Sequence, residues 1–219
     1  MLTPDVAELK RLTLSKLDWW IFPADAEIPA LHLTSLNLTL RRDTPNVLLV
    51  CALVAATAPT LTTLELDLAD EPGQPGAGND LAACLDAFLP LIGATLRHLV
   101  LVVHYKLHGV ERVLEQFSAL DSLRLDFRNE LDHIEYLDAV TEAIPASVVY
   151  LVLGFERRRS PEPELGVVLG IVAASLPTRP ALKSVTLLGV SELPGGDCSA
   201  FPSQCEARGV KVVLRPRRG

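Results

Sequence analysis

Aromatic residues are scarce in this chain of 219 residues. Phe, Trp and Tyr make up 5% of the sequence, whereas hydrophobic residues as a class make up 49% and the mean hydropathy is +0.30. A core built from stacked rings is therefore excluded, and Leu, Val and Ala must supply most of the buried volume. So much aliphatic surface requires a large core, which a chain of this length can form as one domain.

Positive charge is also in short supply. The chain has 20 Lys and Arg against 27 Asp and Glu, and its net charge is -7. Proteins that bind nucleic acids depend on cationic side chains to neutralise phosphates. The charge balance therefore predicts no nucleic-acid partner.

Long apolar runs are missing as well. The two most apolar stretches, residues 47–58 and 165–176, have 12 residues each, and a membrane-spanning helix needs about 20. We therefore expect no membrane association and interpret both stretches as buried helices. Gly166 and Gly170 form a G-x-x-x-G pattern in the second stretch, which here predicts close packing inside the fold.

The sequence also lacks a secretory signal, because Asp5 and Glu8 interrupt the start where a basic and then apolar stretch would be needed. Such a chain is expected in the cytoplasm or nucleus with reduced thiols. Cys198 and Cys205 flank a short segment and leave three alternatives open: a disulfide, half of a metal site, or two free thiols. The four cysteines are Cys51, Cys84, Cys198 and Cys205.

Common catalytic signatures are absent too. The chain contains no G-x-G-x-x-G, Walker loop, G-x-S-x-G or H-E-x-x-H pattern, so no cofactor or catalytic residue is predicted. One alternative is a metal-dependent enzyme that uses His104, His108 and Glu111, which have the spacing of ligands on a helix. Gly109 interrupts that helix, and the segment starts where a strand should end. We therefore favour a non-enzymatic protein.

What the chain does contain, throughout its length, is the pattern L-x-x-L-x-L. Consecutive copies start 24 to 35 residues apart, which is the length of a strand and a helix with short connections. Helices are predicted between them at residues 45–57, 79–92, 110–117, 133–144 and 164–176. The copies start at Leu9, Leu33, Leu61, Leu96, Leu120, Val148 and Leu182, with a weaker eighth at Gly209.

The spacing within the pattern has a structural explanation. The last two leucines are two residues apart and face the same side of a short strand, while the first comes from the turn before it. Alternating strands and helices predict parallel strands, since each helix returns the chain to the start of the next strand. A solenoid would place these strands in chain order. A doubly wound α/β domain, the alternative, would reorder them.

The units resemble leucine-rich repeats, and the longer ones are similar to the ribonuclease-inhibitor type. The resemblance implies an α/β leucine-rich-repeat-like solenoid, or horseshoe, with a parallel inner sheet of about eight strands and outer helices, spanning residues 1–219 as one domain. It also implies binding of a protein partner. The chain departs from the family at the Asn or Cys ladder position, which holds Arg41, Ala69, His104, Arg128, Glu156 and Val190.

Two segments, "APTLTTLEL" and "CEARGVKVVL", resemble the C-terminal repeat regions of fungal F-box proteins. In that family the repeats capture substrates for a ubiquitin ligase, and the F-box binds the Skp adaptor. No F-box is found in these 219 residues. A Skp-type adaptor is therefore expected only through a domain absent from this chain.

Outward residues of the strands alternate with the leucines and should line the inner face of the sheet. Aromatic and arginine side chains are favoured as anchors of protein interfaces, so we expect a partner to bind on this concave face. The predicted binding residues are Glu65, Asp67, His98, Arg124, Asp126 and Tyr150.

Two further features bear on the ends and the repetition of the array. Trp19 and Trp20 are the only tryptophans and are expected to seal the first unit, which lacks a polar cap. A longer parent chain or a partner is expected to cover that end. The unit lengths also hint at a duplication of three units, with a period near 87 residues.

Overall fold

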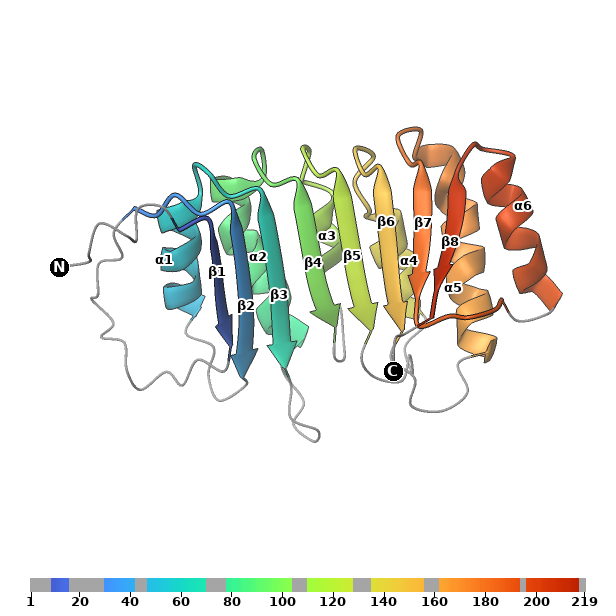
Figure 1. Cartoon of the computed structure of the whole chain (residues 1–219), viewed down its shortest axis with the longest axis horizontal. Coiled ribbons are helices and arrows are strands. Elements are labelled where there is room, and N and C mark those ends of the chain that lie inside the picture. Colours follow the sequence, from blue (N-terminus) through green and yellow to red (C-terminus); the bar gives the residue numbers. More distant parts are fainter. Residues whose placement is uncertain are drawn as a thin grey trace.

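The eight strands lie in one sheet in the order in which they occur in the chain. The computed structural model describes residues 9–15, 30–41, 47–69, 78–103, 110–127, 135–155, 162–193 and 196–216. All neighbouring strands are parallel (Figure 1). The strands are β1 (Arg11–Ser15), β2 (Ser35–Arg41), β3 (Thr63–Ala69), β4 (His98–Val103), β5 (Ser122–Phe127), β6 (Tyr150–Phe155), β7 (Ser184–Leu188) and β8 (Lys211–Arg215).

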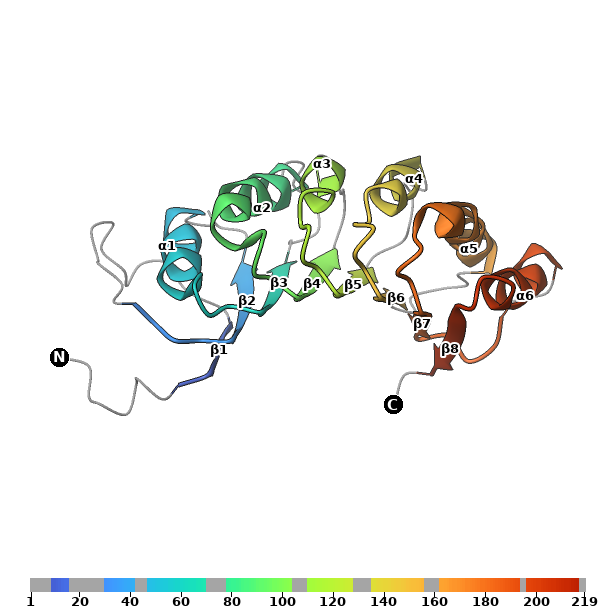
Figure 2. The same cartoon turned by 90° about the horizontal axis from the view of Figure 1, so that it is seen from above.

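The helices cover one face of this sheet. Seen from above, the sheet curves away from them, so the face without helices is concave (Figure 2). This arrangement confirms the predicted α/β leucine-rich-repeat-like solenoid and excludes the doubly wound alternative, whose strands would not follow chain order. The α-helices are α1 (Val47–Thr57), α2 (Gly78–Ile92), α3 (Val110–Leu114), α4 (Glu135–Glu142), α5 (Glu162–Ser175) and α6 (Ala200–Glu206).

Helix α6 was not predicted. Its short sequence has no repeated apolar spacing, and only Phe201 and Cys205, four residues apart, are buried. Two apolar residues in one turn of a seven-residue helix are too weak a pattern to separate it from a loop. The 3₁₀ segments η3 (Leu176–Thr178) and η4 (Gly196–Ser199) precede β7 and α6.

The repeated leucines form the core, as predicted. Within each central unit, the first leucine of the pattern and the two strand leucines have almost no exposed surface. In-register pairing stacks equivalent leucines from neighbouring units, and each buried side chain contributes roughly 1.5–3 kcal/mol. One of these buried core rows runs through Leu12, Leu36, Leu64, Leu99, Leu123, Leu151, Val185 and Val212.

A backbone ladder connects consecutive units where the chain enters each strand. The carbonyl of Lys10 accepts hydrogen bonds from the N–H groups of Thr34 and Ser35, at 2.9 and 3.1 Å. The same doubled acceptance recurs at the carbonyls of Thr34, Thr62, Arg97, Asp121 and Val149. Because main-chain groups make these bonds, stacking at this edge does not depend on the Asn or Cys side chains that the repeat positions lack.

Side-chain hydroxyls also bond between neighbouring units, and two of these hydrogen bonds are equivalent. Thr60 Oγ1 donates to the carbonyl of Leu33, and Ser147 Oγ donates to the carbonyl of Leu120, each over 2.8 Å. Donors and acceptors are both 87 residues apart in the sequence. The contact therefore recurs at the period of the predicted three-unit duplication.

The last two cysteines, Cys198 and Cys205, are buried and form no disulfide. Burial raises the pKa of the Cys205 thiol to about 11, so it is neutral at neutral pH. A Cβ added at Gly166 would lie 3.2 Å from Sγ of Cys198, which confirms close packing there. The prediction was wrong for Gly170, because no atom lies within 4 Å of the place where its Cβ would be.

Among the helices in the described ranges, none combines the length and apolar character required to cross a membrane. Residues 16–29, which include both tryptophans, lie outside those ranges.

Arg179 joins two neighbouring units from inside the fold. Its side chain donates to the carbonyl of Glu142 over 2.8 Å and also to the carbonyl of Thr141, at the end of α4. A second nitrogen donates to Thr178 Oγ1 at 2.8 Å. Burial lowers the pKa of Arg179, and the nearby Glu142 opposes that shift. The guanidinium thus stabilises the carbonyl end of α4, where positive charge is favourable.

Replacement of this arginine should destabilise the fold. The change Arg179→Ala leaves the carbonyls of Thr141 and Glu142 without their donor, and we expect a loss of about 2–4 kcal/mol in the free energy of unfolding. Urea denaturation followed by circular dichroism measures it. Lys183→Ala, at an exposed position nearby, serves as the control and should change stability by about 0.5 kcal/mol or less. Equal effects of the two changes would contradict the role assigned to Arg179.

Candidate functional site

Three rows of outward-facing positions cross the concave face. The register of the strands aligns position with position, so residues far apart in the sequence become neighbours. The upper row is Arg11, Ser35, Thr63, His98, Ser122, Tyr150, Ser184 and Lys211; the middle row is Thr13, Asn37, Glu65, Val100, Arg124, Val152, Thr186 and Val213; the lower row is Ser15, Thr39, Asp67, Val102, Asp126, Gly154, Leu188 and Arg215.

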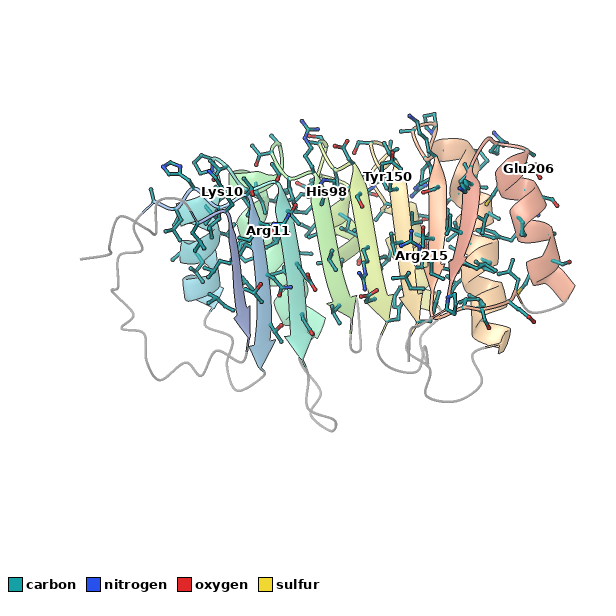
Figure 3. All side chains as sticks on the ribbon, in the orientation of Figure 1. Lys10, Arg11, His98, Tyr150, Glu206 and Arg215 are labelled. Carbon is teal, nitrogen blue, oxygen red and sulfur yellow. The ribbon has the colours of Figure 1, made fainter. Side chains whose placement is uncertain are left out.

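Tyr150 places an exposed aromatic side chain in the upper row. It is 50% exposed and pairs with Ser122 on one side and Ser184 on the other. His98 lies two strands away in the same row, and both residues are seen near the upper ends of their strands (Figure 3). The small serines leave the tyrosine ring accessible from the concave side.

Arg124 and Asp126 form a two-point ion pair on β5. The Nε of Arg124 donates to Oδ1 of Asp126 at 3.0 Å, and an Nη nitrogen donates to Oδ2 at 2.6 Å. The hydrogen bond to Asp126 raises the pKa of Arg124, and Glu65 contributes a smaller effect in the same direction. Such parallel hydrogen bonds fix the plane of a guanidinium. The arginine side chain nevertheless remains 43% exposed, so it is both oriented and accessible.

Gly154 makes room for this ion pair. It pairs with Asp126 across β5 and β6, and a Cβ added there would lie 2.0 Å from Oδ1 and 2.9 Å from Cγ of Asp126. The carboxylate therefore lies over the glycine backbone. Any larger residue at this position would push the carboxylate aside and release Arg124.

The fold brings some of the six predicted binding residues together and separates others. Tyr150, Arg124 and Asp126 come together on β5 and β6, and we call them, with Gly154, the central patch. Val152 contributes an apolar side chain beside Arg124, its partner in the middle row. His98 and Glu65 flank the central patch from β4 and β3.

Asp67 is the exception on the predicted face. It belongs to the lower row, yet only 7% of its surface is exposed. A carboxylate with so little accessible surface offers a partner almost nothing to contact, so we leave Asp67 out of the proposed contact set. Gly154 was not among the predicted binding residues. Its one local signal is a glycine inside an otherwise apolar strand, which often marks a close approach of another group.

The alternative metal site receives no support from the described residues. Glu111 lies on α3, on the helical side of the sheet, while His104 and His108 fall outside the described ranges. Across the ranges that are described, no group of three or more His, Cys, Asp or Glu residues could hold a metal ion.

Comparisons with known proteins show similarity at the level of solved structures. No family model matches the chain, and no curated protein matches it. Among solved structures, the chain is similar to the leucine-rich repeat-containing protein LegL7 from Legionella pneumophila, with 16% sequence identity and a TM-score of 0.34. The match covers 93% of this chain and 89% of the other. The assignment of the fold rests on the strand order and register.

Enlarging the glycine should free the arginine without unfolding the protein. In Gly154→Ala the new methyl group displaces the Asp126 carboxylate, and a surface ion pair of this kind contributes only about 1 kcal/mol to stability. The Nε–H of Arg124, observed by NMR, should then exchange faster with water.

Gly170→Ala is the matched control, because its added Cβ contacts nothing within 4 Å. It should leave the exchange of the Arg124 Nε–H unchanged. An unaltered exchange rate in Gly154→Ala would show that the glycine does not hold the pair in place.

Proposed function

We propose that this chain is a non-catalytic protein-interaction module that binds its partner on the concave face. The observation that carries the proposal is that the oriented guanidinium of Arg124 and the exposed ring of Tyr150 lie on the same face of the sheet, on adjacent strands. Tyrosine and arginine dominate the binding energy of many protein interfaces. An arginine already held by Asp126 also loses less side-chain freedom on binding than a mobile one.

The surroundings of the central patch suit the same role. Val100 and Val152 flank Arg124 in the middle row and supply apolar surface that a partner can dehydrate. His98 and Glu65 lie farther out, where polar groups usually form the rim of an interface. Cys198 and Cys205 form no disulfide, which is compatible with a reducing compartment, and we propose the cytoplasm or nucleus.

The central patch is tested by affinity capture. The changes Tyr150→Ala and Arg124→Ala remove the two anchors. Each should weaken the binding of the captured partner by about 30-fold or more. Mass spectrometry identifies the partner, and titration with the purified partner measures the dissociation constant. Unchanged binding by the double variant would refute the assignment of the central patch.

Matched controls come from exposed positions on the helices. Leu91→Ala on α2 removes an apolar side chain that is 41% exposed, and Arg112→Ala on α3 removes an exposed arginine. Both should bind the partner as the wild type does. A loss of binding in these variants would instead place the interface on the helical side.

We further propose that the captured protein is a substrate of an F-box-type ubiquitin ligase. The support for this role is the resemblance of the strand entries and the final unit to fungal F-box repeat regions. The natural protein, purified through an affinity tag from its own cells, should then bring a Skp-type adaptor with it. Residues 1–219 alone should capture the substrate without the adaptor. Recovery of the partner with no adaptor by the natural protein would refute the ligase role and leave the binding role standing.

A further inference from the structure

Strand β8 ends the sheet with incompletely covered apolar side chains. Val212 and Leu214 occupy the same core rows as Val185 and Leu187 of β7. The two β7 residues are 0% exposed, whereas both β8 residues are only half-buried. Helix α6 packs against β8 from the helical side (Figure 2). The exposed surface therefore lies toward the open edge, where a ninth strand would be placed.

The backbone of β8 also has hydrogen-bonding groups directed to that edge. The N–H of Lys211 donates to the carbonyl of Lys183 at 2.8 Å, and the carbonyl of Arg215 accepts from Gly189 at 2.9 Å. Residues 211, 213 and 215 therefore face β7. Since main-chain groups alternate along a strand, the N–H and C=O groups of Val212 and Leu214 point away from the sheet.

Two cations frame this edge. Lys211 and Arg215 are exposed at the two ends of β8, and both belong to the rows of the concave face. Arg215 is labelled in Figure 3. Each would lie beside an outward residue of an added strand. The positive charge at both ends of β8 contrasts with the net charge of -7 of the whole chain.

A second copy of the chain fits this edge poorly. Antiparallel pairing of two β8 strands centred on Val213 would set Lys211 opposite Arg215 at both ends. Continuation of the parallel sheet onto β1 of another copy, in the register that the other strands keep, would set Lys211 beside Arg11. Like charges directly opposite one another in a sheet are destabilising, and lysine on an edge strand commonly prevents self-association.

We propose that β8 is a docking edge for an extended segment of a partner protein that carries an acidic residue at each end. Its main chain adds a ninth strand and bonds to Val212 and Leu214. Its two carboxylates face Lys211 and Arg215. The apolar residues that lie between the two acidic residues cover Val212 and Leu214. The pattern is acidic, apolar, any residue, apolar, acidic, and it reads the same in both directions. Addition of a strand to a sheet edge is a common mode of peptide recognition.

This edge is a binding surface separate from the central patch. Lys211 lies two strands from Tyr150 in the upper row, and none of the backbone groups of β8 contributes to the central patch. A partner could therefore occupy one surface or both. The test consequently uses a defined peptide and does not depend on the partner of the concave face.

The probe is the synthetic peptide Thr-Glu-Val-Thr-Val-Glu-Thr with blocked ends, added at millimolar concentration to the whole chain. Amide hydrogen exchange, measured by NMR, should show slowed exchange at Val212 and Leu214. The amide of Val213, which faces β7, should exchange slowly with and without the peptide. Slowed exchange elsewhere on the sheet, or none at these two amides, would overturn the proposal.

Charge reversal tests the flanking cations at exposed positions. The double variant Lys211→Glu and Arg215→Glu should bind the glutamate peptide about tenfold more weakly, because two attractive cross-strand pairs become repulsive. The same variant should bind the peptide Thr-Lys-Val-Thr-Val-Lys-Thr better than the wild type does. Arg112→Ala is the control and should bind both peptides as the wild type does. Equal affinity of the wild-type chain for the two peptides would contradict the charge assignment.

The oligomeric state tests the alternative occupant. In analytical ultracentrifugation, the free chain is expected to show no self-association through β8. The change Leu214→Pro removes an N–H that points to the open edge and leaves the bonds to β7 intact, and it should abolish peptide binding. A dimer that this change dissociates would show that the edge is filled by a second copy, and would overturn the proposed partner.

Discussion

In-register pairing of parallel strands is the constraint on which the rest of this structure depends. The doubled hydrogen bonds at the carbonyls before the strands align each unit with the previous one. This alignment stacks leucine on leucine in the core, and it necessarily aligns the outward residues as well. A shift of one residue would exchange the two faces. The register that stabilises the fold therefore also brings the ion pair of Arg124 and Asp126 beside Gly154, which lies 28 residues after Asp126 in the chain.

Much of the fold could be predicted from the leucine pattern, because each strand carries its own local signal. Leu64 and Leu66, for example, identify both the strand and its buried side. Helix α6 has no such signal, since Phe201 and Cys205 are its only buried residues. Gly170 shows the opposite case, because the pattern that it shares with Gly166 predicted a contact that only one of the two glycines makes.

The central patch could be predicted only in part. Alternation along a strand places Tyr150, Arg124 and Asp126 on the concave face, but it does not say how side chains of adjacent strands fit together. The close approach of Asp126 to Gly154 depends on the pairing of two strands in three dimensions. The burial of Asp67 likewise depends on its surroundings and not on its position in the pattern. Local sequence thus fixes which face a residue occupies, whereas tertiary packing decides which residues are accessible.

The claim that a partner binds the concave face is tested most directly by hydroxyl-radical footprinting of the chain with its captured partner. Three exposed side chains sample opposite sides of the fold: Tyr150 on the sheet, at 50%, and Leu91 and Val167 on the helices, at 41% each. Binding should protect Tyr150 from modification and leave Leu91 and Val167 as reactive as in the free chain. Protection of Leu91 and Val167 with Tyr150 still fully reactive would place the interface on the helices and contradict the account.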